Sequence, residues 1–290
     1  MKITNKYGLP DPIINALHRP TYTKGGANVS ATELLTSPRI VQLRRKHSEE
    51  LEQDASEMVW SLFGSVLHTL LERGKDDRHI VEERLHTTLD GWSISGAIDL
   101  QTVKNGKIKV SDYKTTGAWT VMNEKADWTS QLNIYAWLVQ ITKGIPVSSL
   151  EIVAIIRDWA KREADRKDDY PQAPIVTIPI TLWSMEESEE FIRKRINQHA
   201  DALMSSETGS DLPECSPEDM WERQSAWAVK KIKGVRAKSV HYSEEDANKA
   251  LEVAGKEYAI EFRPGERVRC QNYCAVSQFC EQWAQYRREK

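Results

Sequence analysis

The stretch that decides the fold is HIVEERLHTTLDGWSISGAIDLQTVKNGKIKVSDYK, residues 79–114. It contains three runs rich in Val, Ile and Thr, at 79–89, 92–103 and 107–114. The dipeptides Asp90-Gly91 and Asn105-Gly106 separate these runs. Such dipeptides between alternating runs are the strongest short-range signal for a β-hairpin. The segment is therefore predicted to form a three-stranded antiparallel meander.

Helical patterns lie on both sides of the meander. Apolar residues recur at helical spacing over about 56–73, and Ser30 with Glu33 forms a capping-box pattern at an earlier helix that Pro38 is expected to split. After the meander we expect a helix at about 128–142, strands at 149–157 and 175–182, and a long helix over 183–204. This order of elements predicts an α/β core.

The segments outside this core differ from it in composition. Residues 1–29 carry Pro, Gly, Asn and Thr without periodicity, and we expect an irregular arm there. From residue 207 onward the chain changes to a Pro-containing loop, a basic run, a short helix over 244–256 and a cysteine-rich tail. We therefore divide the chain into an arm (1–29), a core (30–205) and a C-terminal region (206–290).

The composition is that of a globular protein with little net charge. The 290 residues include 40 Lys and Arg against 43 Asp and Glu, a formal net charge of -3. This balance excludes binding to nucleic acid by global charge and leaves local basic patches for that purpose. No apolar run approaches the roughly 20 residues that span a membrane, and no signal-peptide pattern is visible at the N-terminus. We expect a cytoplasmic protein without a membrane partner.

Acidic and basic side chains gather on the second and third predicted strands. Asp112 and Lys114 are two residues apart and so share one face of a strand, and hairpin pairing can bring Asp99 beside them. Two converging carboxylates repel each other unless a cation lies between them, and Mg²⁺ or Mn²⁺ prefers such oxygen ligands. A nearby lysine can stabilise developing negative charge. The set suits phosphodiester hydrolysis, although an Asp-X-Lys triplet alone is more often a surface salt bridge.

Two helices add polar residues at four-residue spacing. Gly64, His68 and Glu72 share one helix face, and His68 lies within an apolar stripe. Taken alone, such a histidine is usually a hydrogen-bonded core residue. Gln131 and Tyr135 share a face of the later helix and can point to the same cleft as the strands.

Four motifs make the sequence resemble the PD-(D/E)XK nucleases, and among them the RecB-like branch with its lambda-exonuclease-type and CRISPR-associated members. The motifs are Gly64-x3-His68, Gly96-Ala97-Ile98-Asp99, Asp112-Tyr113-Lys114-Thr115-Thr116 and Gln131-x3-Tyr135. They stand in the family's order and at its spacings over about residues 30–140. The resemblance implies a restriction-endonuclease-like core, a central mixed β-sheet flanked by helices, and metal-dependent cleavage of DNA.

The resemblance also implies the ligands of the catalytic metal. His68, Asp99 and Asp112 would bind the Mg²⁺ or Mn²⁺ ion through their side chains. The backbone carbonyl of Tyr113 would complete this shell.

Further roles follow from the same resemblance. Lys114 would position the attacking water and stabilise the pentacoordinate phosphate. Gln131 would orient Lys114 or the DNA backbone, and Tyr135 would support the helix that carries it. Glu72 and Glu83 are weaker candidates, and a structural or solvated role is favoured for both.

The cysteines predict a second metal site. Cys270, Cys274 and Cys280 lie close together near the C-terminus, and clustered thiols in a reducing compartment more often bind metal than form disulfides. The tail is similar to that of AddB and of CRISPR-associated nucleases, in which one early and three late cysteines hold a [4Fe-4S] cluster. It departs from them by one extra residue in the first gap and by Ser37 in the early cysteine's place. Cys215 is then the available fourth ligand for a cluster or, alternatively, for Zn²⁺; free thiols are the remaining possibility.

Two basic runs are candidates for contact with DNA phosphates. They comprise Arg39, Arg44 and Arg45 on the first helix and Lys230, Lys231 and Lys233 in the C-terminal region. A charged run is usually a solvated face, yet a nuclease of net negative charge needs local cations to meet the phosphate backbone.

These features favour a metal-dependent DNA exonuclease that acts on single or double strands with free ends. Its role would be DNA recombination, repair or processing for a phage or mobile element, in the host cytoplasm, with a single-strand annealing or recombination protein as a possible partner. One alternative is a DNA-binding scaffold with a vestigial nuclease core, against which the intact Asp99, Asp112 and Lys114 argue. A zinc-stapled structural protein is another, and it leaves those residues and His68 unexplained.

Overall fold

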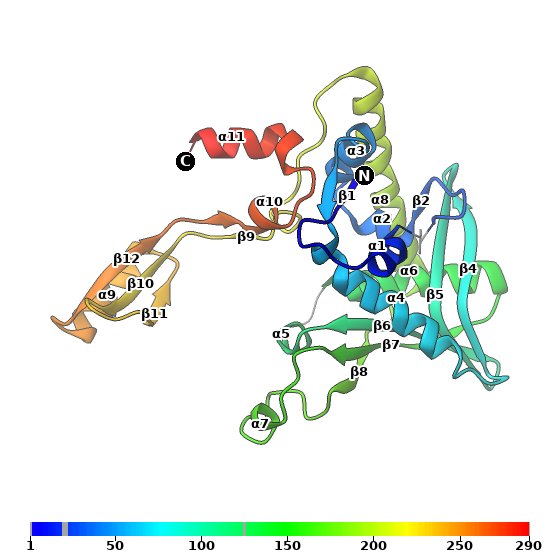
Figure 1. Cartoon of the computed structure of the whole chain (residues 1–290), viewed down its shortest axis with the longest axis horizontal. Helices are drawn as coiled ribbons and strands as arrows, with labels where there is room; N and C mark the ends of the chain where they lie inside the picture. Colours follow the sequence, from blue (N-terminus) through cyan, green and yellow to red (C-terminus); the bar gives the residue numbers. More distant parts are fainter. Residues whose placement is uncertain (1, 19–22, 124–125, 290) are drawn as a thin grey trace.

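A computed structural model describes residues 2–18, 23–123 and 126–289 (Figure 1). Its centre is a six-stranded mixed sheet in the order β2-β5-β6-β7-β8, in which β4 also pairs with β5. The strands are β2 (Val29–Ser30), β4 (His79–Leu89), β5 (Trp92–Lys104), β6 (Lys107–Thr116), β7 (Val147–Ile156) and β8 (Ile175–Ile180). The predicted α/β fold, with a central mixed sheet and flanking helices, is confirmed.

The two turn dipeptides set the register of the meander. All four of their residues have positive φ, between 49° and 79°, as a two-residue type I′ hairpin loop requires. Leu89 consequently pairs with Trp92, and Lys104 with Lys107. Strands β4, β5 and β6 therefore form the predicted antiparallel meander.

Three helices build the core on this sheet. α6 (Ala126–Lys143) packs on the strands, and α2 (Ala31–Leu35) and α8 (Met185–Thr208) pack on α6. Strands β6 and β7 run parallel, so the chain must cross over between them, and α6 is that crossover. Ser184 and Glu187 form the predicted capping box of α8. Residues buried where these layers meet include Ile98, Leu132, Trp137, Ile152 and Ile192.

Glycine at position 96 permits the close packing of α6 on β5. A Cβ atom there would lie 2.6 Å from Leu138 Cδ1 and 3.0 Å from two ring carbons of Tyr135. Gly64 on α4 (Val59–Glu72) is a useful contrast, because its added Cβ would meet only Thr115 Oγ1, at 3.7 Å.

We therefore expect opposite effects on stability from alanine at these two glycines. Gly96→Ala should lower the free energy of unfolding by about 1–3 kcal/mol, because overpacking displaces α6. Gly64→Ala should preserve or raise stability, because alanine is favoured over glycine inside a helix by up to about 1 kcal/mol. Urea unfolding of the two variants measures the difference, and equal stabilities would contradict this account of Gly96.

α4 carries the apolar stripe predicted over 56–73, after a 3-10 turn at Ala55–Met58. It contacts β6, but none of its residues is buried. Val59, Phe63, Val66 and Leu70 lie on the side of the helix away from His68 and are 43% to 52% exposed. The helix is thus held mainly along the side that carries His68.

The N-terminal segment is more regular than predicted. It contains β1 (Lys2–Thr4), which pairs in parallel with β3 (Glu52–Asp54), and α1 (Asp11–Leu17). Pro12 lies in the first turn of α1, where its missing N–H costs no hydrogen bond. The expectation of an irregular arm is therefore wrong for these two stretches, and its residues 1 and 19–22 lie outside the described part of the chain.

Short helices complete the core. Pro38 separates α2 from α3 (Pro38–Lys46), as predicted. α5 (Ala118–Met122) follows β6, and α7 (Lys161–Ala164) lies between β7 and β8.

The C-terminal region contains a second arm, residues 222–267, which is distinct from the N-terminal arm. A closing segment, residues 268–289, follows it. At the base of the arm, β9 (Glu222–Arg223) pairs with β13 (Glu266–Arg267). Beyond this ribbon, the rest of the arm stands away from the core (Figure 1). It comprises β10 (Ala226–Lys231), β11 (Ala237–His241), α9 (Glu244–Ala254) and β12 (Tyr258–Arg263). The closing segment returns to the core with α10 (Val268–Asn272), a 3-10 turn at Ser277–Phe279, and α11 (Glu281–Glu289).

Candidate active site

Two buried carboxylates face each other on neighbouring strands. Asp99 on β5 is 8% exposed and Asp112 on β6 is 2% exposed. The backbone N–H of Tyr113 donates to Asp99 Oδ2 at 2.8 Å, which fixes that carboxylate against β6. Burial, together with the nearby charge of Asp112, raises the pKa of Asp99 to about 7.

Lys114 and Gln131 complete a polar network around Asp112. Lys114 Nζ lies 2.7 Å from Asp112 Oδ2 and donates to Gln131 Oε1 at 3.1 Å. Gln131 Nε2 in turn donates to Asp112 Oδ1 at 3.2 Å and to Tyr135 Oη at 2.8 Å. Gln131, supported by Tyr135 four residues later on α6, thus fixes the positions of Lys114 and Asp112 on β6 relative to each other.

His68 reaches the same site from α4. Its Nδ1 lies 2.9 Å from Glu82 Oε1 and 3.6 Å from Asp99 Oδ1. The hydrogen bond with the Glu82 carboxylate raises the pKa of His68 above its ordinary value. Ligand atoms of His68, Glu82 and Asp99 all lie within 4.8 Å of one another. That group does not include Asp112, whose carboxylate lines the same cleft and contacts Lys114 and Gln131; its role as a metal ligand stays a prediction.

Glu82 is a site residue that the sequence analysis missed. The Asp90-Gly91 loop places Val81 opposite Leu100 and Glu83 opposite Ile98, so Glu82 lies opposite Asp99. Its φ of +50° is unusual for a glutamate in a strand. Glu83 points elsewhere, because its carboxylate accepts hydrogen bonds from Lys143 and Gln101. Counting residues back from the hairpin turn would have identified Glu82 from the sequence alone.

These residues line a cleft of about 520 Å³. It includes Thr32, Ser61, Gly64, His68, Glu72, Glu82, Ala97, Asp99, Asp112, Lys114, Gln131 and Tyr135. Asp112 Oδ2 is buried, and within the described part of the chain no donor has hydrogen-bond geometry to it; its contact with Lys114 is an ion pair. An underbonded carboxylate oxygen next to a second buried carboxylate fits a divalent cation, since the ion relieves both the repulsion and the missing bond.

Glu82 is placed to orient His68. A carboxylate on one ring nitrogen fixes the histidine tautomer and leaves the other nitrogen for metal. We therefore expect Glu82→Gln to weaken the binding of Mn²⁺ to the cleft by about 10- to 100-fold, as measured by isothermal titration calorimetry. Glu83→Gln is the matched control, because it removes a neighbouring carboxylate from the other face of β4. Equal Mn²⁺ affinity in the two variants would contradict this role.

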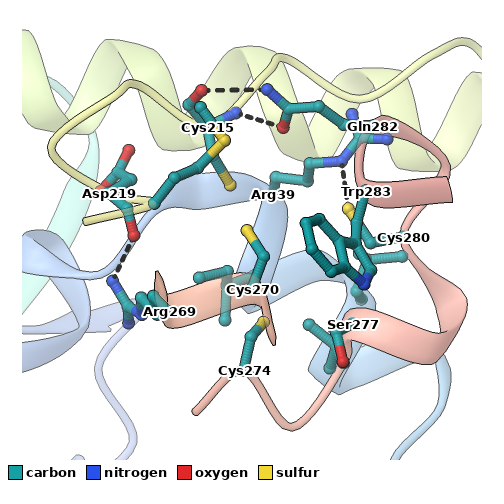
Figure 2. A pocket seen from close by; sticks show the side chains of 14 residues that line it. Arg39, Cys215, Asp219, Arg269, Cys270, Cys274, Ser277, Cys280, Gln282 and Trp283 are labelled. Atoms are coloured by element: carbon teal, nitrogen blue, oxygen red, sulfur yellow. Dashed lines mark hydrogen bonds between the residues drawn. The ribbon is translucent and has the colours of Figure 1, made fainter. Parts of the chain in front are cut away.

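The four cysteines line a second site, next to α3. None forms a disulfide, and all four line one pocket with Arg39, Met220, Arg269 and Trp283 (Figure 2). Cys215 comes from the loop after α8, and the other three come from the closing segment. Burial raises the pKa of both the Cys215 and the Cys270 thiol to about 11. Both thiols therefore stay protonated unless a cation binds them.

Arg39 belongs to this pocket and not to a DNA-binding surface. It is 8% exposed, and its guanidinium donates to Cys280 Sγ at 3.3 Å and to the Leu212 carbonyl at 2.6 Å. The predicted DNA contact of Arg39 is therefore wrong, because the closing segment covers this side chain.

The other predicted phosphate contacts lie on exposed surfaces. Arg44 and Arg45 line a groove of about 620 Å³, where Arg45 pairs with Glu33 at 2.7 Å. Lys230 pairs with Glu261, and Lys231 lies 3.8 Å from Glu257. Lys233 follows β10 at the exposed tip of the arm. These contacts with DNA stay predictions.

The fold and the cleft together define an α/β protein of nuclease type. The chain belongs to the PD-(D/E)XK nuclease superfamily, whose family model matches residues 31–281. The search of curated proteins gives no match.

Among solved structures, the chain is similar to SSO0001, with 19% identity, a TM-score of 0.44 and coverage of 64% of this chain and 82% of that one. It is also similar to a candidate exonuclease from Eubacterium rectale, with 13% identity, a TM-score of 0.32 and coverage of 61% and 65%. In the described residues, no helix is both long and apolar enough to cross a membrane.

Proposed function

We propose that the protein is a divalent-metal-dependent DNA exonuclease. The observation that carries this proposal is the buried pair of Asp99 and Asp112, with Lys114 Nζ 2.7 Å from Asp112 Oδ2. Membership of a nuclease superfamily implies a nucleic acid substrate. A vestigial core would have no use for two buried carboxylates that destabilise the fold in the absence of a cation.

Each side chain of the cleft has a definite task in this proposal. Asp99, Asp112 and His68 would hold a Mg²⁺ or Mn²⁺ ion, together with the backbone carbonyl of Tyr113. The ion would supply Lewis acidity to the phosphoryl oxygen and lower the pKa of a water molecule. Lys114 would orient the attacking water and stabilise negative charge on the phosphate. Gln131, which accepts from Lys114 and donates to Asp112, would keep that ammonium in place.

Cleavage assays with two DNA forms test this function. We expect end-labelled linear DNA to be degraded from its ends in Mn²⁺ or Mg²⁺, with Mn²⁺ at least as effective, because an imidazole ligand suits Mn²⁺ better. Excess EDTA should abolish degradation, and closed circular DNA should stay intact. Nicking of the circle would refute the exonuclease assignment. Full activity in EDTA, without carried-over metal, would refute the metal mechanism.

A role in recombination extends the proposal. We infer that the protein acts in the RecB-like manner on DNA ends of a phage or mobile element, together with an annealing or recombination protein. The histidine on α4 and the cysteine tail, which the resemblance attributes to that branch, support this inference.

We further propose that the four cysteines bind a structural [4Fe-4S] cluster. A tetrahedral Zn²⁺ site with Zn–S bonds of about 2.3 Å brings its sulfurs to roughly 4 Å from one another. Within the described chain, which includes all four cysteines, no three thiols lie within 4.8 Å of one another, so the thiols are not gathered as closely as a tetrahedral Zn²⁺ site needs. The buried Arg39 guanidinium, bonded to Cys280 Sγ, supplies positive charge next to an anionic metal–thiolate centre.

The pocket indicates how such a centre would assemble. Its internal space is about 10 Å³, which is room for about one water molecule. We therefore expect the closing segment to fold around the metal, so that metal binding and folding of the tail are coupled.

A further inference from the structure

The Cys215 thiol contacts a serine side chain that the nuclease chemistry does not use. Ser37 Oγ lies 3.1 Å from Cys215 Sγ, although 178 residues separate the two positions. Ser37 is fully buried. It precedes α3 as the N-cap residue, yet its hydroxyl makes no capping hydrogen bond. Its hydroxyl contacts the thiol instead, and this contact places Ser37 beside the cysteine pocket.

Further hydrogen bonds fix the segments that carry Ser37 and Cys215. The backbone N–H of Cys215 donates to Gln282 Oε1 at 2.9 Å, and Gln282 Nε2 donates to the Cys215 carbonyl at 3.1 Å. Two residues beyond Ser37, Arg39 connects α3 to Cys280 and to the Leu212 carbonyl. The start of α3, the loop that carries Cys215 and the closing segment therefore form one packed unit (Figure 2).

From this geometry we propose that positions 37 and 215 are interchangeable sources of one metal-binding thiolate. The inference rests on the cysteine centre proposed above. Cys270, Cys274 and Cys280 supply three ligands from the closing segment, and the fourth comes from the buried corner where Ser37 and Cys215 meet. A thiol at position 37 costs no helix cap, because the serine hydroxyl does not act as one.

Relocation of the cysteine tests the proposal. Four proteins are purified anaerobically: wild type, Cys215→Ser, the double variant Cys215→Ser/Ser37→Cys and the double variant Cys215→Ser/Thr36→Cys. Iron, sulfide and zinc are then measured per folded chain. We expect Cys215→Ser to lose most of its metal, and the variant with Ser37→Cys to regain at least half of the wild-type content. The variant with Thr36→Cys is the matched control and should regain none, because Thr36 bonds the Thr32 carbonyl and lines the neighbouring groove.

The outcomes separate this inference from the centre on which it rests. Metal-free wild type would refute both. A metal-loaded wild type with no recovery in the Ser37→Cys double variant would refute the interchange alone, and so would equal recovery in the Thr36→Cys control.

The single variant Ser37→Cys keeps all four native cysteines and so covers the case in which a double variant fails to fold. Its metal content per chain should equal that of wild type, because either thiol can serve as the fourth ligand. A content well below that of wild type would overturn the proposal, because the thiol at position 37 would then disturb the centre instead of replacing Cys215. Measurement of metal content needs no nuclease activity.

Discussion

The Asp112→Ala and Lys114→Ala variants should each lose DNA cleavage by at least about a thousandfold, since a lost ligand or charge stabiliser costs several kcal/mol in the transition state. The folded state should tolerate the Asp112 change well. Asp112 raises the pKa of Asp99 by charge repulsion, so its removal relieves that repulsion in metal-free protein. We expect a melting temperature in EDTA that is equal to or above that of wild type.

Initial cleavage rates on end-labelled linear DNA, with thermal unfolding of the same preparations, measure both effects. Glu151→Ala is the control: its carboxylate pairs with Lys109 and accepts from Ser111 on the other face of β6. That variant should retain its rate. A near-wild-type rate for either cleft variant would contradict the assignment of the site, and so would equal losses in all three.

The second large effect concerns the cysteine pocket. Cys270→Ser should lower the free energy of unfolding of the C-terminal region by roughly 4 kcal/mol, if the loop-closure estimate for a disulfide of this span transfers to a metal clip. The centre would link Cys215 to a segment that begins at Cys270, and loss of the link frees the intervening chain. Metal–thiolate bonding adds to this contribution.

Thermal unfolding of anaerobically prepared protein measures this change. Ser277→Ala is the matched control, because Ser277 lines the same pocket without a thiol. A [4Fe-4S] cluster should make the protein brown, whereas zinc would leave it colourless. If neither metal is found and Cys270→Ser melts like wild type, the cysteines are ordinary packing residues.

Local signals predicted the strands and most of the cleft correctly. The two Gly-containing turns fix the meander, and period-two and period-four spacing place Asp112 with Lys114 and Gln131 with Tyr135. The same turn also specifies Glu82, because an antiparallel register is fixed once its loop is known. Glu83, for which a structural or solvated role is favoured, pairs with Lys143 and accepts from Gln101 instead.

Contacts between distant segments were not predictable in this way. Arg39 reads as a basic surface residue in its helix, and its burial depends on Cys280, which is 241 residues away. The regular structure of β1 likewise depends on pairing with β3 about fifty residues later. At such positions the contacts between distant segments override the local pattern. A single sequence does not show which distant segments come into contact.

The two ends of the C-terminal arm, residues 222–267, lie side by side at its base. Arg223 pairs with Glu266 across the β9–β13 ribbon, and directly opposed strand residues lie about 5 Å apart at their Cα atoms. Everything beyond that ribbon is an excursion between the two halves of the cysteine pocket. A two-residue turn in place of residues 224–265 would therefore close the same gap. Removal of the arm would take away a hydrogen bond to the closing segment, the one that Tyr286 Oη donates to the Gly265 carbonyl at 2.9 Å, so this arm is attached to the rest of the chain mainly at its base.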